Sequence, residues 1–152
     1  MQKLNLPQYK FRYRIEENKR LIFDKFRKKY VALTPEEWVR QNFIQYLIEE
    51  KNYSEQLIVS EMFLSINNMK KRCDIAVFNN SGKVLLIVEC KSPKVKITQE
   101  TFKQIAGYNL NLKVEYLIVT NGLSHYCCKL DHKNNSYEFL KEIPNYKEIN
   151  CE

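Results

Sequence analysis

The sequence predicts one α/β domain in which helices pack on a mixed β-sheet. The expected order of elements is a hairpin, a helix, three strands, a second helix and further strands. The segment from Val84 to Cys90 is apolar at almost every position, as a central strand covered on both faces should be. The length of 152 residues fits a single core. We expect one domain over residues 1–152, with a core at about 33–130.

A β-hairpin is expected at about residues 11–23, before this core. Tyr13 and Ile15 lead into the polar turn from Glu16 to Lys19, and an apolar segment ending at Phe23 returns. The basic stretch at residues 25–29 is expected to be a solvated loop or turn. The hairpin is therefore predicted to have two strands.

The first helix has a clear start in the sequence. Thr34 can cap it, Pro35 suits the first helical position, and Glu37 can complete a capping box. The helix is expected to end near Lys51. Its buried stripe is predicted to comprise Val39, Phe43, Tyr46 and Leu47.

The remaining elements follow from apolar runs and turn residues. Asn79 to Gly82 form a turn between two strands, and Asn121-Gly122 separates two later ones. The second helix is expected at about residues 98–110. Strands are expected near residues 57–66, 72–78, 84–90, 114–120, 126–130 and 137–140.

Composition narrows the classes of function. Lys and Arg total 25 against 18 Asp and Glu, and the net charge of +7 suits a polyanionic partner such as nucleic acid, or a membrane surface. The five cysteines form no C-x-x-C pair, and the only histidines are His125 and His132, which argues against a zinc site. Reduced thiols, a polar N-terminus and the lack of a long apolar run predict a cytoplasmic protein with no membrane segment.

Three charged residues are predicted to meet at the end of the central strand. Glu89 and Lys91 share one face of it by alternation. A four-residue loop at 79–82 would place Asp74 opposite Ile87, on that same face and diagonal to Glu89, at roughly 5–8 Å between side-chain bases. A slip of one residue would turn Asp74 to the opposite face.

Such a cluster suits phosphodiester hydrolysis. Asp74, Glu89 and the backbone carbonyl of Cys90 are oxygen donors that could hold one divalent cation, which would stabilise phosphate charge and acidify a water. Lys91 could orient that water or neutralise the phosphate. The alternative is a strand-end ion pair between Glu89 and Lys91, with Asp74 as a surface acid.

The segment RCDIAVFNNSGKVLLIVECKSP resembles motifs II and III of the PD-(D/E)XK nuclease superfamily. More narrowly, the chain resembles the N-terminal nuclease domain of type I restriction enzyme R subunits, also through LTPEEWVRQNF and VTNG. The resemblance runs from about residue 11 to 130. It implies a restriction-endonuclease-like core, metal ligation by Asp74 and Glu89, a catalytic Lys91, and Mg²⁺ as cofactor with Mn²⁺ as a substitute. Cys73 stands where many relatives have proline.

Other residues are candidates for supporting roles. Gln104 and Tyr108 match a Q-x-x-x-Y mark of some such nucleases, which implies DNA contact or organisation of the site, although an ordinary helix face explains them equally well. Gly107 between them hints at a close backbone approach. Further candidates are Glu37 as a metal ligand, Arg40 as a phosphate or carboxylate partner, and Lys94, Lys96 and residues 70–72 along a DNA backbone. Glu61 is expected to be solvent-exposed.

The expected function is therefore a Mg²⁺-dependent endonuclease acting on DNA, linked to type I restriction. The alternative is a catalytically silent nuclease-fold module that binds DNA or assembles with partner proteins. An RNA-acting or junction-resolving nuclease differs only in substrate. The resemblance implies motor or specificity subunits as partners, and double-strand cutting would call for a homodimer.

Overall fold

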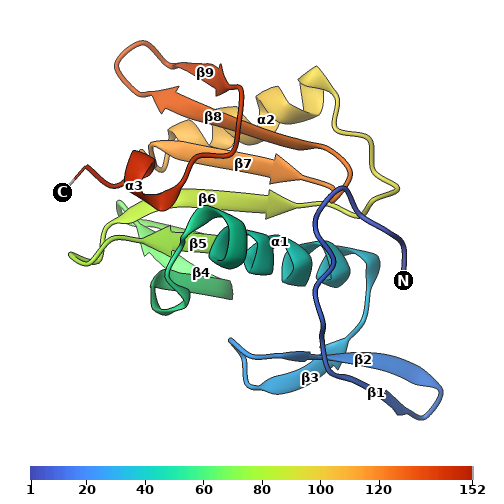
Figure 1. The fold of residues 1–152 in the computed structure, drawn as a ribbon. Helices are drawn as coiled ribbons and strands as arrows, with labels where there is room; N and C mark the ends of the chain where they lie inside the picture. The colour runs from blue at the N-terminus through green and yellow to red at the C-terminus, as the bar shows by residue number, and fades with distance from the viewer. Residues whose placement is uncertain (152) are drawn as a thin grey trace.

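The computed structural model describes residues 1–151, apart from the side chain of Met62. Over these residues the chain forms a small N-terminal sheet and a larger sheet with its helices (Figure 1). In chain order the elements are β1 (Tyr13–Glu16), β2 (Lys19–Asp24), β3 (Lys29–Ala32), α1 (Pro35–Lys51), η1 (Glu55–Leu57, a 3-10 turn), β4 (Ile58–Ile66), β5 (Met69–Phe78), β6 (Val84–Cys90), α2 (Gln99–Leu110), β7 (Tyr116–Thr120), β8 (His125–Asp131), β9 (Ser136–Leu140) and α3 (Tyr146–Ile149).

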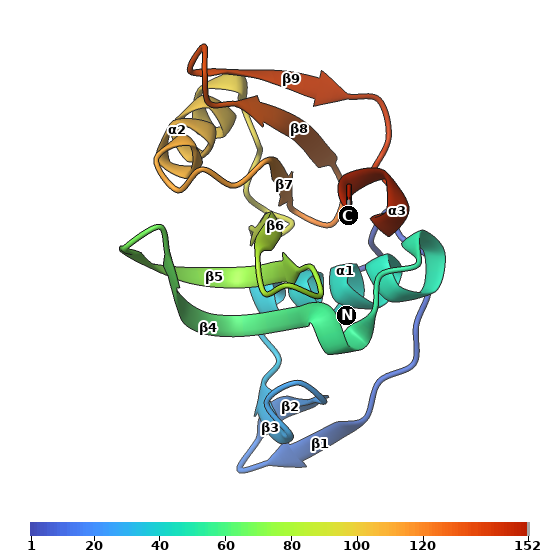
Figure 2. The ribbon, with the colours of Figure 1, turned by 90° about the vertical axis from the view of Figure 1, so that its left-hand side faces the viewer.

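The main sheet contains β4 to β9 in sequence order. β6 and β7 run parallel, and every other neighbouring pair is antiparallel. α1 covers one face of the sheet and α2 covers the other (Figures 1 and 2). The prediction of a mixed sheet flanked by helices is therefore confirmed.

An apolar cluster fills each side of the main sheet. Phe43 of α1 packs in one cluster with Leu86 and Val88, and Phe102 of α2 packs in the other with Ile87. Because Leu86, Ile87 and Val88 alternate between the two clusters, the strand is covered on both faces, as its continuous apolar run predicts. β6 is thus a rigid central strand, and its end is a fixed position for side chains.

α1 begins and ends where the sequence predicts. The Thr34 side chain accepts a hydrogen bond from the Glu37 amide, and the helix runs to Lys51. The capping box is only half formed, because the Glu37 carboxylate binds other side chains and the Thr34 amide donates to the Ala32 carbonyl. Among the described residues, no helix has the length and apolar character needed to cross a membrane.

The N-terminal sheet has three strands, not the two of the predicted hairpin. β1 pairs with β2 and β2 with β3, all antiparallel. The basic stretch forms a turn at residues 25–28, and β3 follows it directly. Ile22 in the central strand is fully buried, which anchors the sheet to the rest of the molecule. The preceding segment runs back along α1, where Trp38 donates to the Gln2 carbonyl.

The β5–β6 hairpin differs from its predicted register by two residues. Ala76, not Asp74, stands opposite Ile87. Phe78 pairs with Val84, one residue later than expected, and a bulge directly before Phe78 adds a second shift of one residue. A shift of one would have reversed the faces, whereas a shift of two preserves them.

Pairing between β4 and β5 is interrupted at Glu61 and Asp74. The regular ladder stops after Ser60 and Ile75 and resumes at Cys73. Glu61 has a φ of 51°, in the left-handed region that non-glycine residues seldom adopt. Ile75 packs on the α1 side and Cys73 on the α2 side, so β5 rotates about its axis at Asp74. Asp74 therefore belongs to neither regular half of the strand.

Candidate active site

Asp74 lies at the rim of the main sheet, in line with the end of β6. Its Oδ2 accepts a hydrogen bond of 2.8 Å from the Cys90 amide, in the place where a β5 carbonyl would continue the ladder. Burial raises the pKa of the Asp74 carboxyl to about 7, and the charges of Glu89 and Glu61 act in the same direction. The Cys90 hydrogen bond opposes this rise. Asp74 is thus a half-buried acid held close to two others.

Glu61 is the neighbour that the sequence did not single out. It was expected to be solvent-exposed, but its side chain is only 14% exposed and pairs with Arg72 and with Arg40. Although burial opposes it, hydrogen bonding from Arg72 and the charge of Arg40 lower the pKa of Glu61. A hydrogen bond also links Glu61 to Asp74. No local sequence signal predicts this, because it depends on the left-handed turn of β4.

Glu89 faces the α2 side of the sheet. Its Oε1 lies 2.6 Å from Lys71 Nζ, and that ammonium lies 4.6 Å from the centre of the Tyr108 ring. Tyr108 is therefore connected to Glu89 through Lys71, which supports a place for Tyr108 beside the site. Lys71 was expected to follow a DNA backbone. It forms an ion pair with Glu89 here, and its contact with DNA stays a prediction. Arg72, expected in the same role, is paired with Glu61.

Lys91 follows β6 directly and continues its pairing with β7. Its amide donates to the Thr120 carbonyl at 2.8 Å, which fixes the backbone at this point. The side chain is partly buried and forms no ion pair within residues 1–151. Cys90 is buried, and burial raises the pKa of its thiol well above the usual value. Among the described residues, Lys91 is thus a cation without a carboxylate partner, two positions after Glu89.

Glu37 and Arg40 lie inside a buried network of charges below the rim. Glu37 Oε1 accepts from Arg27 at 2.8 Å and from Arg40, and its Oε2 accepts from Gln41. Arg40 also lies 3.7 Å from Asp24. Arg40 is only 4% exposed, so the carboxylate role, one of the two expected for it, is the one that these contacts describe.

A cleft of about 270 Å³ joins this network to the rim. Asp74, Cys90 and Glu61 line one part of it, and Glu37 and Arg40 line another. Among the described residues, no three side chains of His, Cys, Asp or Glu stand close enough together to enclose a metal ion. A cation here would therefore bind through one or two carboxylates, backbone carbonyl oxygen and water, which is the usual pattern for Mg²⁺.

Comparison with known sequences decides the family. The family model of the type I restriction enzyme R protein N terminus matches residues 35–144. The chain belongs to this family. No curated protein matches the sequence closely enough to count as a relative.

A solved structure agrees with this assignment. The fragment structure of a putative HsdR subunit of a type I restriction enzyme from Vibrio vulnificus is similar over 75% of this chain, with a TM-score of 0.53 and 16% identity. The chain spans about a quarter of that protein, 24% of its length. The expected restriction-endonuclease-like core is confirmed, and the family places the chain among nuclease-like modules related to type I restriction. The N-terminal sheet lies outside the residues that the family model matches.

The remaining predicted contacts lie on the surface. Gln104 is exposed on α2 one turn before Tyr108, and Lys94 and Lys96 are exposed in the loop after β6. Their roles toward a substrate stay predictions. Gly107 does not mark a close approach, because a Cβ built there would meet nothing within 4 Å.

Proposed function

We propose that the chain is a Mg²⁺-dependent endonuclease module that hydrolyses DNA phosphodiester bonds in a type I restriction system. The proposal rests on one contact above all, the hydrogen bond of 2.8 Å from the Cys90 amide to Asp74. It holds a half-buried carboxylate beside the Glu89-Cys90-Lys91 segment at the end of a rigid strand. Family membership supports the restriction setting.

The acids at the rim favour a bound cation electrostatically. Asp74 is half-buried beside Glu61 and Glu89, and its loss of solvation together with their charges raises the pKa of its carboxyl to about 7, so its negative charge is poorly compensated. A divalent cation would relieve this repulsion. Asp74, Glu89 and the Cys90 carbonyl would hold it, and we expect Mn²⁺ to substitute for Mg²⁺. Glu37 is the less suitable ligand, because two guanidinium groups already neutralise it.

The bound metal and the protein side chains would then have different roles in hydrolysis. A bound Mg²⁺ supplies charge stabilisation at the phosphate and a more acidic water. Lys91 has no carboxylate partner within the described chain, so its ammonium is free to hold the attacking water or the phosphate oxygen. Tyr108 and Gln104 extend the site along α2, where they would contact the DNA strand.

Cleavage of supercoiled plasmid with Mg²⁺ tests this function. Asp74→Asn, Glu89→Gln and Lys91→Met should each reduce the rate by at least about 100-fold. Glu138→Gln, which removes an exposed acid on β9, is the matched control and should keep the wild-type rate. Undiminished cleavage by the Asp74 or Lys91 variant would refute the assignment. Parallel reactions with single-stranded RNA and a four-way DNA junction identify the substrate.

A second measurement follows the metal without catalysis. Electron paramagnetic resonance of Mn²⁺ titrated with protein reports the free ion directly. Wild-type and Glu138→Gln protein should bind Mn²⁺, and Asp74→Asn should bind it at least about ten-fold more weakly. Equal binding by all three proteins would place the metal elsewhere.

One observation favours a silent module as the second candidate. Glu89 is already neutralised by Lys71, and Glu61 by Arg72, so two of the three acids have cationic partners without a metal. Such a module would bind DNA or assemble with motor and specificity subunits, and it would not cut with any divalent metal. If it does cut both strands, we expect a homodimer, because one such centre cuts one strand.

A further inference from the structure

The net positive charge of the chain is confined to its first part. Residues 1–32 contain ten Lys and Arg against three Asp and Glu, whereas residues 33–152 contain fifteen of each. The whole charge of +7 therefore comes from the N-terminal sheet and the segment leading to it. These residues also precede the range that the family model matches. The basic character is thus a property of residues 1–32 and not of the nuclease-like core.

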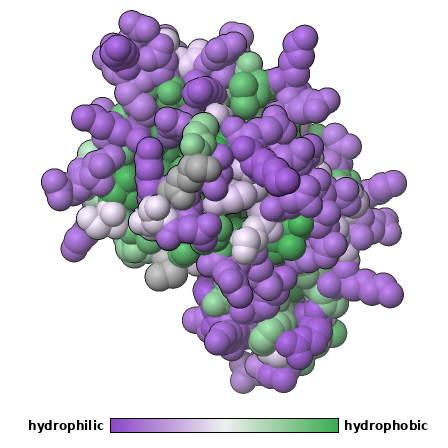
Figure 3. All heavy atoms as spheres, turned by 60° about the vertical axis from the view of Figure 1, so that its left-hand side comes forward, coloured by the Kyte–Doolittle hydropathy of each residue, from purple (hydrophilic) through white to green (hydrophobic). Residues whose placement is uncertain are grey.

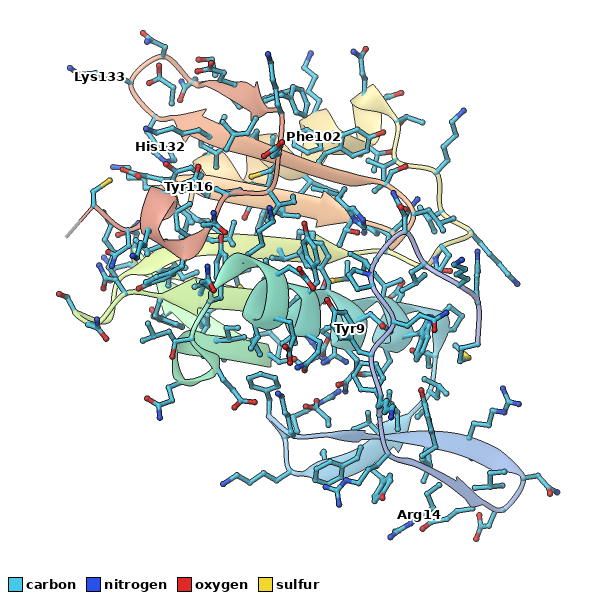
Figure 4. The ribbon with its side chains drawn as sticks, viewed as in Figure 1. Tyr9, Arg14, Phe102, Tyr116, His132 and Lys133 are labelled. Carbon is cyan, nitrogen blue, oxygen red and sulfur yellow. The ribbon has the colours of Figure 1, made fainter. Side chains whose placement is uncertain are left out.

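Strand register divides the side chains of this sheet between two faces. Tyr13, Ile22 and Val31 stand opposite one another on the inner face, where Ile22 is buried. Arg14 and Phe23 are on the outer face, since they alternate with these positions. The outer face comprises Arg12, Arg14, Glu16, Lys19, Leu21, Phe23, Tyr30 and Ala32. Arg14 extends from β1 away from the main sheet (Figure 4).

Each arginine of the outer face lies over an aromatic ring. The guanidinium carbon of Arg12 lies 4.0 Å from the centre of the Phe23 ring, and that of Arg14 lies 4.1 Å from the centre of the Tyr30 ring. The two rings contact each other edge-on, with centroids 5.2 Å apart. A guanidinium that stacks on a ring keeps its N–H groups free at the edge and loses less freedom on binding a phosphate.

Little of this charge is neutralised by the protein itself. Three of the ten cations form ion pairs: Arg14 with Glu16 at 3.1 Å, Lys25 with Glu55, and Arg27 with Asp24 and Glu37. Arg12 and Lys19 form no ion pair within the described chain. Figure 3 shows the N-terminal sheet at the bottom of the view, where most of the surface is hydrophilic and some hydrophobic side chains lie among the hydrophilic ones. Exposed cations held in fixed positions beside apolar rings are typical of surfaces that bind a nucleic-acid backbone.

The sheet also adjoins the candidate site. Arg27, Val31 and Ala32, from the β2–β3 turn and from β3, line the same cleft as Asp74. β3 leads directly into α1, so the sheet is tied to the helix that forms the floor of that cleft. A polyanion bound on the sheet could therefore continue to the rim of the main sheet.

We propose that the outer face of the N-terminal sheet binds the sugar–phosphate backbone of nucleic acid, independently of sequence, through Arg12, Arg14 and Lys19. This surface is separate from the metal-binding residues and works without them. It would hold substrate near the cleft, or hold DNA in a module that does not cut.

The test compares two triple variants that lose the same charge. Arg12→Gln/Arg14→Gln/Lys19→Gln removes the outer-face cations, and Lys133→Gln/Lys141→Gln/Lys147→Gln removes three exposed lysines of the main sheet and its C-terminal segment. Lys133 lies at the opposite end of the molecule from Arg14 (Figure 4). Fluorescence anisotropy is measured with a labelled 30-base single strand and a 30-base-pair duplex in EDTA, from 50 to 200 mM KCl.

The outer-face variant should bind both oligonucleotides at least about ten-fold more weakly than wild type. Its slope of log K against log salt on the duplex should fall by about two to three, since each lost phosphate contact contributes about 0.9. The main-sheet variant should remain within about two-fold of wild type. Equal weakening by both variants would overturn the proposal, as would binding to phosphatidylserine vesicles without binding to either oligonucleotide.

Two further proteins separate binding from folding and from catalysis. Arg12→Lys/Arg14→Lys keeps the charge and should keep most of the salt slope, whereas a loss equal to that of the Gln variant would indicate a damaged sheet and refute the backbone role. Glu138→Gln, which changes an exposed acid outside both regions, should bind as wild type does. Because binding is measured in EDTA, a loss of binding bears on this proposal alone, whereas Mg²⁺-dependent cleavage by the wild-type chain bears on the proposed function.

Discussion

The cleft and the N-terminal sheet are both rich in charged residues, but their arginines differ in burial and in the groups that they contact. Around the cleft, Arg40 is buried among Asp24, Glu37 and Glu61. On the outer face of the sheet, Arg12 is exposed and rests on a ring instead of a carboxylate. An arginine that is buried with acids therefore stabilises the fold, whereas an exposed arginine that stacks on an aromatic ring keeps its charge available to a ligand.

Removing one arginine from each region tests this difference most directly. Arg40→Met should lower the free energy of unfolding by about 3 kcal/mol, because it removes the buried cation of this network and leaves only Arg27 to pair with Glu37 and Asp24. Arg12→Met should cost about 1 kcal/mol or less, the value of an exposed cation–π contact. Urea unfolding measures both. Similar costs for the two variants would show that the regions do not differ as described.

The pH dependence of the free energy of unfolding tests the raised pKa of Asp74 in the cleft. The pKa of the Asp74 carboxyl is raised from 3.8 to about 7, so the folded protein binds more protons than the unfolded chain between these values. Stability contributed by Asp74 is therefore present at low pH and is lost as pH rises toward 7. Asp74→Asn should stabilise the metal-free protein at pH 7.5 and change little at pH 3.5.

Urea midpoints in EDTA at several pH values measure this effect. Glu138→Gln, on an exposed strand position, is the control and should follow the wild-type curve. A constant difference between Asp74→Asn and wild type across this range would contradict the assigned pKa. Saturating Mg²⁺ should reduce the difference between pH values, since a bound cation compensates the same charge.

A smaller effect is expected at Gly107, which belongs to neither region. A Cβ there would meet nothing within 4 Å, and the residue is inside α2. Gly107→Ala should therefore raise the free energy of unfolding by about 0.5–1 kcal/mol through helix propensity. Thermal unfolding measures it, and a loss of stability would indicate a contact that the structure lacks.

The smallest effect is expected for a single cation of the N-terminal sheet. Lys19→Gln should change the free energy of unfolding by less than about 0.5 kcal/mol, because the ammonium is exposed and has no ion pair within residues 1–151. Urea unfolding in the same buffer checks this. A larger loss would mean that this charge, too, is structural.

The sequence predicts the regular parts of the fold well. Both long helices and all six strands of the main sheet follow from periodicity, capping residues and turn residues, because these signals are local. β3 was missed because its four residues follow a basic turn and have no apolar alternation. The short α3 and η1 were missed for a similar reason, since each is held by packing and not by a long repeat.

The candidate site is less accessible from the sequence. The positions of Asp74 and Glu89 on neighbouring strands follow from the strand assignments, but their register depends on a bulge that has no sequence marker. Glu61 was misjudged because its partners lie on another strand and on a helix, Arg72 on β5 and Arg40 on α1, and the Lys71–Glu89 ion pair was missed because it joins two strands. Whether Asp74, Glu89 and Lys91 act together stays a prediction, and the metal and cleavage measurements test it.

The interruption in the β4–β5 ladder has a consequence for how this carboxylate is presented. In an unbroken hairpin, Asp74 would point squarely above or below the sheet, toward one helix or the other. With one rung missing and Glu61 turned into the left-handed region, the acid instead reaches sideways and takes over as the last pairing partner of β6. The interruption in the ladder therefore brings a carboxylate oxygen of Asp74 to the end of β6.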